Sequence, residues 1–138
     1  MDNYESEQEI AAVVQGFEDC ATRKEDFTHR NHLTVAVWYL NHSTPQEALQ
    51  KMRTGLFRFL DHHGVGREKY NETVTIFWIK LVQSAMNELD EETSLVATTN
   101  TTLERLANPR VVFEYYSEAC LKSEVAKTRW VEPDLKSL

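Results

Sequence analysis

Apolar residues recur along most of the chain at the three- and four-residue spacing of amphipathic helices. The first such stripe runs from about Ser6 to about Thr22, and the next follows from Phe27 to about Asn41. Glycine and proline are scarce, at four and three residues, and no hairpin signal interrupts the pattern. The pattern predicts an all-α fold: a single compact, bundle-like domain of about six helices with an extended C-terminal tail.

The third helix has the clearest start signal. Thr44 can cap it, Pro45 suits the first helical position, and Glu47 completes a capping box. Gly64 is expected to end it. Its apolar face is predicted to hold Ala48, Leu49, Met52, Leu56, Phe59, Leu60 and His63. We expect His62 and His63 to lie at the end of this helix, where they can approach the following loop.

A helix from about Asn71 to Leu89 is predicted to be the most buried element, because it is apolar on almost every side. Glu72 falls on an apolar side of this helix, where a carboxylate needs a partner or its pKa rises. The alternative is that Asn71 caps the helix and Glu72 only occupies the positive end of its dipole.

The last third of the chain has weaker periodicity. We expect a short or frayed helix in Thr93–Thr102, another in Thr102–Ala107, one opened by Asn108-Pro109 and continuing through Cys120, and a last turn capped by Ser123. The tail 130–138 is expected to pack back onto the bundle through Trp130 and Leu135.

Composition and charge narrow the function classes. With 138 residues, 41% hydrophobic and 27% charged, the chain fits an ordinary globular domain. The net charge of −7 argues against nucleic-acid binding, since basic residues such as Lys51, Arg53 and Arg58 are scattered singly. No apolar run reaches the ~20 residues of a membrane span. The acidic N-terminus does not resemble a targeting signal, so the expected location is the cytoplasm, with Cys20 and Cys120 reduced.

His29 and His32 are the first candidates for chemistry. If their segment is helical, both lie on the face that carries Leu33, Ala36 and Val37, and residues three apart can converge on one ion or ligand atom. The spacing is not that of the zinc-protease helix. The alternative is two histidines at the edge of the core, each with a hydrogen-bond partner.

Three stretches of the chain together resemble a family of small bacterial all-α proteins with no established activity. They are Phe27-x-His29-x-x-His32-Leu33, then Tyr70-x-Glu72-Thr73-x-Thr75-x-Phe77-Trp78, then Tyr116-Ser117 with Leu121, Ser123, Ala126 and Arg129, followed by Pro133-Asp134-Leu135. The family pattern has His between the Tyr and the Glu of the second stretch, where this chain has Asn71. The resemblance supplies candidate residues and no function.

The main hypothesis is a polar pocket in which His29, His32 and Glu72 bind a metal ion or a small molecule. Two imidazoles and one carboxylate suit a divalent metal such as zinc or iron. Without metal, Glu72, His29 and Tyr70 are candidate acid–base groups for hydrolysis or oxidation, between which the sequence does not choose. Asp134 is a candidate acceptor for a histidine.

The alternative hypothesis is a non-catalytic helical interaction module. In it, the same histidines and Glu72 form a structural hydrogen-bond network. Trp38, Tyr39, Phe57 and Tyr115 lie off the main apolar stripes, where they can supply a protein interface or a homo-oligomer contact.

Overall fold

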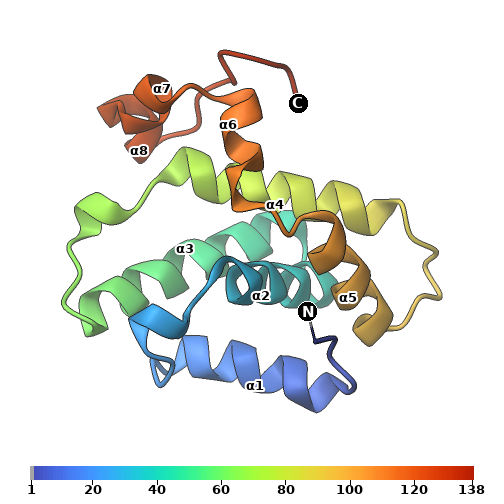
Figure 1. Ribbon diagram of the computed structural model, residues 1–138. Coiled ribbons are helices and arrows are strands. Elements are labelled where there is room, and N and C mark those ends of the chain that lie inside the picture. Colours follow the sequence, from blue (N-terminus) through green and yellow to red (C-terminus); the bar gives the residue numbers. More distant parts are fainter. Residues whose placement is uncertain (1) are drawn as a thin grey trace.

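The computed structural model describes residues 2–138, and its regular elements are all helical, as predicted (Figure 1). The longer helices are α1 (Glu7–Glu18), α2 (His29–His42), α3 (Pro45–His62), α4 (Glu72–Asn87) and α5 (Leu95–Arg105). The short ones are α6 (Val112–Tyr115), α7 (Glu118–Lys122) and α8 (Glu124–Thr128), with 3-10 turns η1 (Lys24–Asp26), η2 (Arg67–Lys69) and η3 (Pro109–Val111).

Side chains set most of the helix boundaries. The capping box of Thr44 and Glu47 is formed at the start of α3, as predicted, and Ser6 and Glu9 form a second one at the start of α1. At the other end of α3, Gly64 adopts a φ of +70°, a left-handed conformation that favours glycine. These local signals explain why the sequence located α3 and the start of α1 well, whereas α1 ends at Glu18, before the predicted end near Thr22.

The main core lies around α2, which contacts α1, α3, α4 and α5. Leu33, Ala36 and Val37, which were predicted to share a face, are all buried there. Helix α4 contacts α2, α3 and α5, and it also contacts α8 on its other side. The prediction that α4 is surrounded by other helices is confirmed, although α2 is equally central.

A second apolar cluster joins α4 to the C-terminal lobe, which we define as α6–α8 with the tail. Phe77 of α4 packs there with Val112, Tyr116 and Leu121. Figure 1 shows this lobe, in orange and red, on the side of α4 opposite α1 and α2. The lobe therefore rests on α4 and forms a separate layer.

The predictions for the last third of the chain were partly wrong. The threonine-rich segment forms one helix, α5, which Ser94 caps by accepting from the Ala97 N–H at 3.1 Å and in which Thr99 Oγ1 donates to the Leu95 carbonyl at 2.7 Å. The helix predicted to continue through Cys120 breaks at Tyr116, whose backbone is extended (φ −126°, ψ 136°). Ser117 then caps the new helix α7, whereas the last turn capped by Ser123 is confirmed.

The tail packs back onto the lobe, but not through both of the predicted residues. Trp130 packs against the second apolar cluster, whereas Leu135 is 58% exposed. Asp134 accepts hydrogen bonds from the backbone N–H and the hydroxyl of Ser117, at 2.8 and 2.6 Å. Its partner is therefore a helix cap, and the expectation that it pairs with a histidine was wrong.

The close approach of α1 and α3 depends on Gly55. A Cβ added there would lie 2.5 Å from Cε2 of Phe17, which is fully buried and stacks on Phe27 with ring centroids 4.8 Å apart. Gly55→Ala is therefore expected to destabilise the fold by about 1–3 kcal/mol, since the overpacking outweighs the better helix propensity of alanine. Urea denaturation measures this, with Thr54→Ala at the neighbouring exposed position as the control; a more stable Gly55→Ala variant would show that the ring has room to move.

The helices of residues 2–138 include none with the length and apolar character that a bilayer span requires.

Candidate functional site

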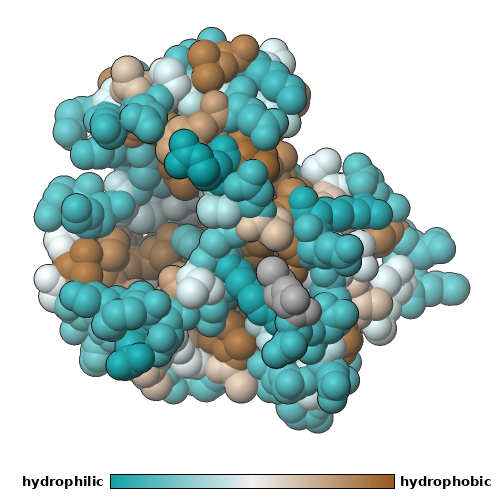
Figure 2. Space-filling view, in the orientation of Figure 1, coloured by the Kyte–Doolittle hydropathy of each residue, from teal (hydrophilic) through white to brown (hydrophobic). Residues whose placement is uncertain are grey.

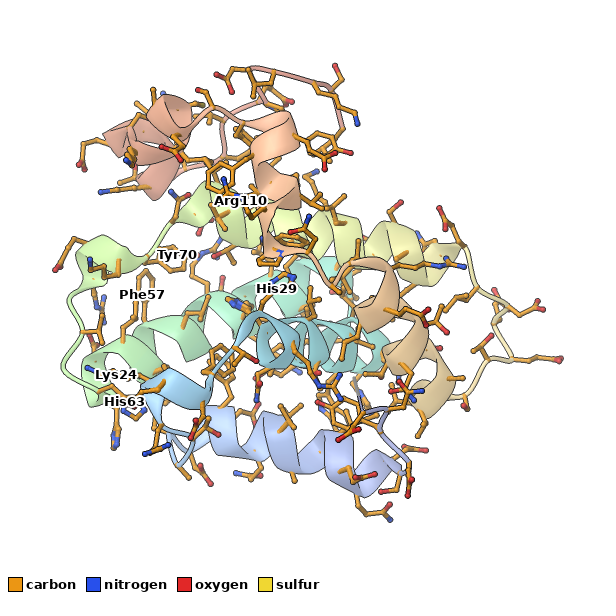
Figure 3. All side chains as sticks on the ribbon, in the orientation of Figure 1. Lys24, His29, Phe57, His63, Tyr70 and Arg110 are labelled. Carbon is orange, nitrogen blue, oxygen red and sulfur yellow. The ribbon has the colours of Figure 1, made fainter. Side chains whose placement is uncertain are left out.

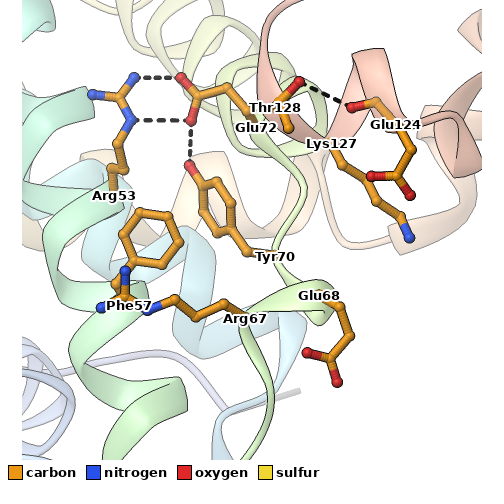
Figure 4. Close-up of a pocket in the computed structure, with 9 residues that line it drawn as sticks. All are labelled: Arg53, Phe57, Arg67, Glu68, Tyr70, Glu72, Glu124, Lys127 and Thr128. Atoms are coloured by element: carbon orange, nitrogen blue, oxygen red, sulfur yellow. Dashed lines mark hydrogen bonds and ion pairs between the residues drawn. The ribbon is translucent and has the colours of Figure 1, made fainter.

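A pocket of about 470 Å³ opens between the body of the protein and the C-terminal lobe. Its walls come from α3, from the η2 segment, from the start of α4 and from α8. Figure 2 shows the surface hollowed between the lobe and the η2 segment, and Figure 4 shows the side chains that line the pocket. We call this the Glu72 pocket.

Glu72 is held in the pocket wall by donors from two directions. Asn71 caps α4, with its Oδ1 accepting from the Val74 N–H at 3.0 Å, and this places Glu72 in the first turn. Arg53 grips the carboxylate with two donors, Nε to Oε1 at 3.0 Å and Nη2 to Oε2, and the Tyr70 hydroxyl donates to Oε1 at 2.5 Å (Figure 4). Asn71 therefore caps the helix, as the alternative predicted, but Glu72 has partners and does more than occupy the positive end of the helix dipole.

These contacts decide the protonation states. Burial by itself raises the pKa of Glu72, but the hydrogen bonds from Arg53 and Tyr70 outweigh it and bring the pKa below its ordinary value. Burial, together with the hydrogen bond to Glu72, raises the pKa of Tyr70 to about 12. At neutral pH the pocket therefore presents an ionised carboxylate and a protonated phenol.

Aromatic rings and further charges complete the Glu72 pocket. The centroids of the Phe57 and Tyr70 rings lie 4.5 Å apart. The guanidinium carbon of Arg67 lies over the Phe57 ring, 4.6 Å from its centroid. Asp61 anchors Arg67 through a 2.8 Å ion pair. Across the pocket, α8 contributes Lys127 to the rim. The pocket combines an apolar surface with charges of both signs.

His29 and His32 line a different, smaller cavity of about 90 Å³ between α2, α3 and α4, which we call the His32 cavity. His29 Nε2 lies 2.8 Å from the Leu106 carbonyl oxygen, so this nitrogen carries the proton and donates it. The His29 ring also packs edge-on against Trp78, with centroids 4.6 Å apart. His29 thus joins α2 to the end of α5, as the structural alternative predicted for a histidine at the core edge.

His32 is in a different situation. Burial lowers its pKa to about 4, with a smaller contribution from the neighbouring His29, so the imidazole is neutral at pH 7. Its ring lies 5.3 Å from the Phe27 ring, and part of its surface faces the cavity.

The predicted metal site is not supported. In the part of the chain that the structure describes, residues 2–138, no three His, Cys, Asp or Glu side chains are grouped as metal ligands. The structure brings Tyr70 and Glu72 together, and it brings His29 and His32 together, but these pairs line separate cavities. Figure 3 shows Tyr70 beside Phe57, whereas His29 lies nearer the centre of the view, below α4. Zinc or iron bound by His29, His32 and Glu72 remains without structural support.

Sequence reasoning missed Arg53 and placed Phe57 only among possible interface residues. Arg53 was treated as a single surface charge, although it lies four residues before Phe57 and therefore on the same face of α3. Both residues line the Glu72 pocket. Tyr39, another suggested interface residue, is 3% exposed and donates to Glu18 Oε2 at 2.6 Å. His62 and His63 lie at the end of α3 and line neither cavity.

Comparison of the chain with models of protein families, with curated proteins and with solved structures found no match. The resemblance to the bacterial family stays a prediction, and functional inference rests on the geometry of the two cavities.

Proposed function

We propose that this protein binds a small polar organic molecule in the Glu72 pocket. The observation that carries the proposal is the Glu72 carboxylate, which is held ionised by Arg53 and Tyr70 in the wall of a pocket of about 470 Å³. Pockets of this size, with an apolar surface and a few fixed polar groups, are the usual form of small-molecule sites.

The carboxylate has capacity left for a ligand. Oε1 accepts from Arg53 Nε and from Tyr70, whereas Oε2 accepts from Arg53 Nη2. An ionised carboxylate offers about four lone-pair positions, so it can accept a further hydrogen bond. The ligand should therefore carry an amine, amide or hydroxyl donor for Glu72 and an apolar part that lies against Phe57 and Tyr70.

The protonation states favour recognition over acid–base catalysis. Glu72 is a weak base because Arg53 and Tyr70 stabilise its ionised form, and Tyr70, with a pKa of about 12, holds its proton at neutral pH. Efficient proton transfer requires a group whose pKa lies near the working pH, and the surroundings of Glu72 and Tyr70 move both pKa values away from neutrality. The same features, a fixed charge and a fixed donor, are those that orient a bound molecule.

A binding screen with a matched variant pair tests the proposal. We would measure thermal shifts with small amines, amino acids, amides and polyols, and then titrate the compounds that stabilise the protein by calorimetry. A ligand at 100 times its Kd adds about 2.7 kcal/mol to the free energy of unfolding. Glu72→Gln is expected to weaken binding tenfold or more, because it removes the charge at the acceptor.

Glu88→Gln is the control for this screen. Glu88 also pairs with an arginine, Arg105, at 2.9 Å, but on the exposed surface, so the substitution removes the same charge away from the pocket. It should leave the affinity unchanged. Failure of all four compound classes to bind the wild-type protein, or equal affinity in the wild type and Glu72→Gln, would overturn the proposal.

A further inference from the structure

We propose that the His32 cavity is a second binding site, which takes a neutral organic molecule of about the size of phenol through a hydrogen bond to His32. This site shares no lining residue with the Glu72 pocket. The two proposals therefore stand or fall separately.

The first argument is that a molecule in the cavity can reach the His32 imidazole. Within residues 2–138, no protein group makes a hydrogen bond to either ring nitrogen of His32, although the ring is neutral and has one donor and one acceptor. Among the described residues, the fully buried side-chain nitrogens and oxygens without a partner do not include those of His32, so its ring nitrogens are open to a guest or to water. The cavity in front of the ring is the place from which such a partner can come.

The second argument is the chemistry of the cavity wall. Most of the wall is apolar, with Ala36 from α2, Met52 from α3 and Trp78 from α4. Thr75 adds a hydroxyl whose hydrogen is already donated to the Asn71 carbonyl at 3.0 Å, so only its lone pairs are open. A guest that fits this wall has an apolar body and one group, such as a hydroxyl, that both donates and accepts.

The third argument concerns charge. The wall contains no carboxylate, amine or thiol, and its other titratable group, His29, already donates to Leu106. A charged guest would lose its hydration without gaining a counter-charge, which is strongly unfavourable. A metal ion would meet two imidazoles and no anionic ligand. Both considerations select a neutral molecule.

The size of the cavity permits such a guest. The space of about 90 Å³ is several times the roughly 10–15 Å³ that one water molecule needs. The cavity therefore holds either a cluster of waters or one small organic molecule. Water is the competing occupant, and the test has to separate the two.

Phenol and toluene are the matched probes, because they differ only by a hydroxyl in place of a methyl group. Titrations followed by ¹H–¹⁵N NMR should place phenol at the α2–α4 contact, with phenol binding about fivefold more tightly than toluene, the worth of one net hydrogen bond. In His32→Leu this preference is expected to disappear. His42→Leu, on the exposed end of the same helix, should keep it.

A cavity-filling variant gives an independent readout. Ala36 is 2% exposed and lines the cavity, so Ala36→Leu should abolish binding of both probes. If that variant does not fold, the NMR shifts of the wild-type protein still locate the probes. Absence of binding of either probe at millimolar concentration would show a water-filled cavity and overturn the proposal. So would phenol binding that His32→Leu leaves unchanged.

Discussion

Arg53→Ala is expected to lower the free energy of unfolding by about 2–3 kcal/mol at pH 7. Glu72 is 8% exposed, and Arg53 and Tyr70 donate hydrogen bonds to its carboxylate. After the substitution, Tyr70 is the one of these two donors that remains. Breaking a buried pair by removing one partner leaves a charge without compensation, at a cost of about 3–5 kcal/mol. The Arg53 side chain is 28% exposed, so water offsets part of this cost. Urea denaturation measures the loss.

Arg105→Ala is the matched control for this experiment. Its ion pair with Glu88 has side chains that are 46% and 66% exposed, and removal of such surface pairs costs about 0–1 kcal/mol.

Acidification provides a second check. As the pH falls through the pKa of Glu72, protonation removes the unpaired charge of the variant and breaks the ion pair of the wild type, so the difference should shrink. A loss equal to that of Arg105→Ala would contradict the role assigned to Arg53.

Between pH 6.5 and pH 4 the protein is expected to lose about 3 kcal/mol of stability through His32 alone. Its pKa is about 4 in the folded protein and about 6.5 in the unfolded chain. The unfolded chain therefore binds more protons in this window, so stability is fully present above pH 6.5 and is lost as the pH falls toward 4. Chemical denaturation at half-unit pH steps measures the slope, and His32→Leu should remove the part of it that His32 contributes.

His42→Leu is the control for the pH series, since it deletes an exposed histidine from the same helix and should leave the slope intact. Glu72 adds to the slope at the acid end of the series, because its pKa in the folded protein lies below its ordinary value and the unfolded chain binds its proton first, so the contribution of His32 is the difference between the wild type and His32→Leu. An unchanged slope in His32→Leu would mean that His32 is hydrated enough to be protonated in the folded protein.

The sequence predicted the helices whose signals are local. The capping box of Thr44 and Glu47, the stop at Gly64 and the apolar face that begins at His29 each depend on residues within a few positions of one another. The break at Tyr116 could not be predicted in this way. It depends on Asp134, which holds Ser117 from 17 residues away, and on Val131, whose carbonyl accepts from the Tyr116 hydroxyl at 2.6 Å.

The sequence identified Glu72, His29 and His32 as polar residues of the interior, but it placed them in one pocket, whereas they line two separate cavities. Glu72 was expected to need a partner, and it has one in Arg53. The histidines instead face Thr75 and Ile79, which lie one and two turns farther along α4. One turn is about 5.4 Å, a distance that decides which cavity a side chain enters. Sequence periodicity shows which residues share one face of a helix. The position along its axis at which it contacts another helix depends on the packing of the whole bundle.

The three tryptophans are distributed so that each reports on a different part of the molecule. Trp38 stacks on His42 near the end of α2, Trp78 lines the His32 cavity, and Trp130 packs beside Tyr116 in the C-terminal lobe. Because indole emission depends on local polarity, variants that keep one tryptophan would give separate optical signals. Body, cavity and lobe could then be followed independently during unfolding or ligand titration, without attached dyes.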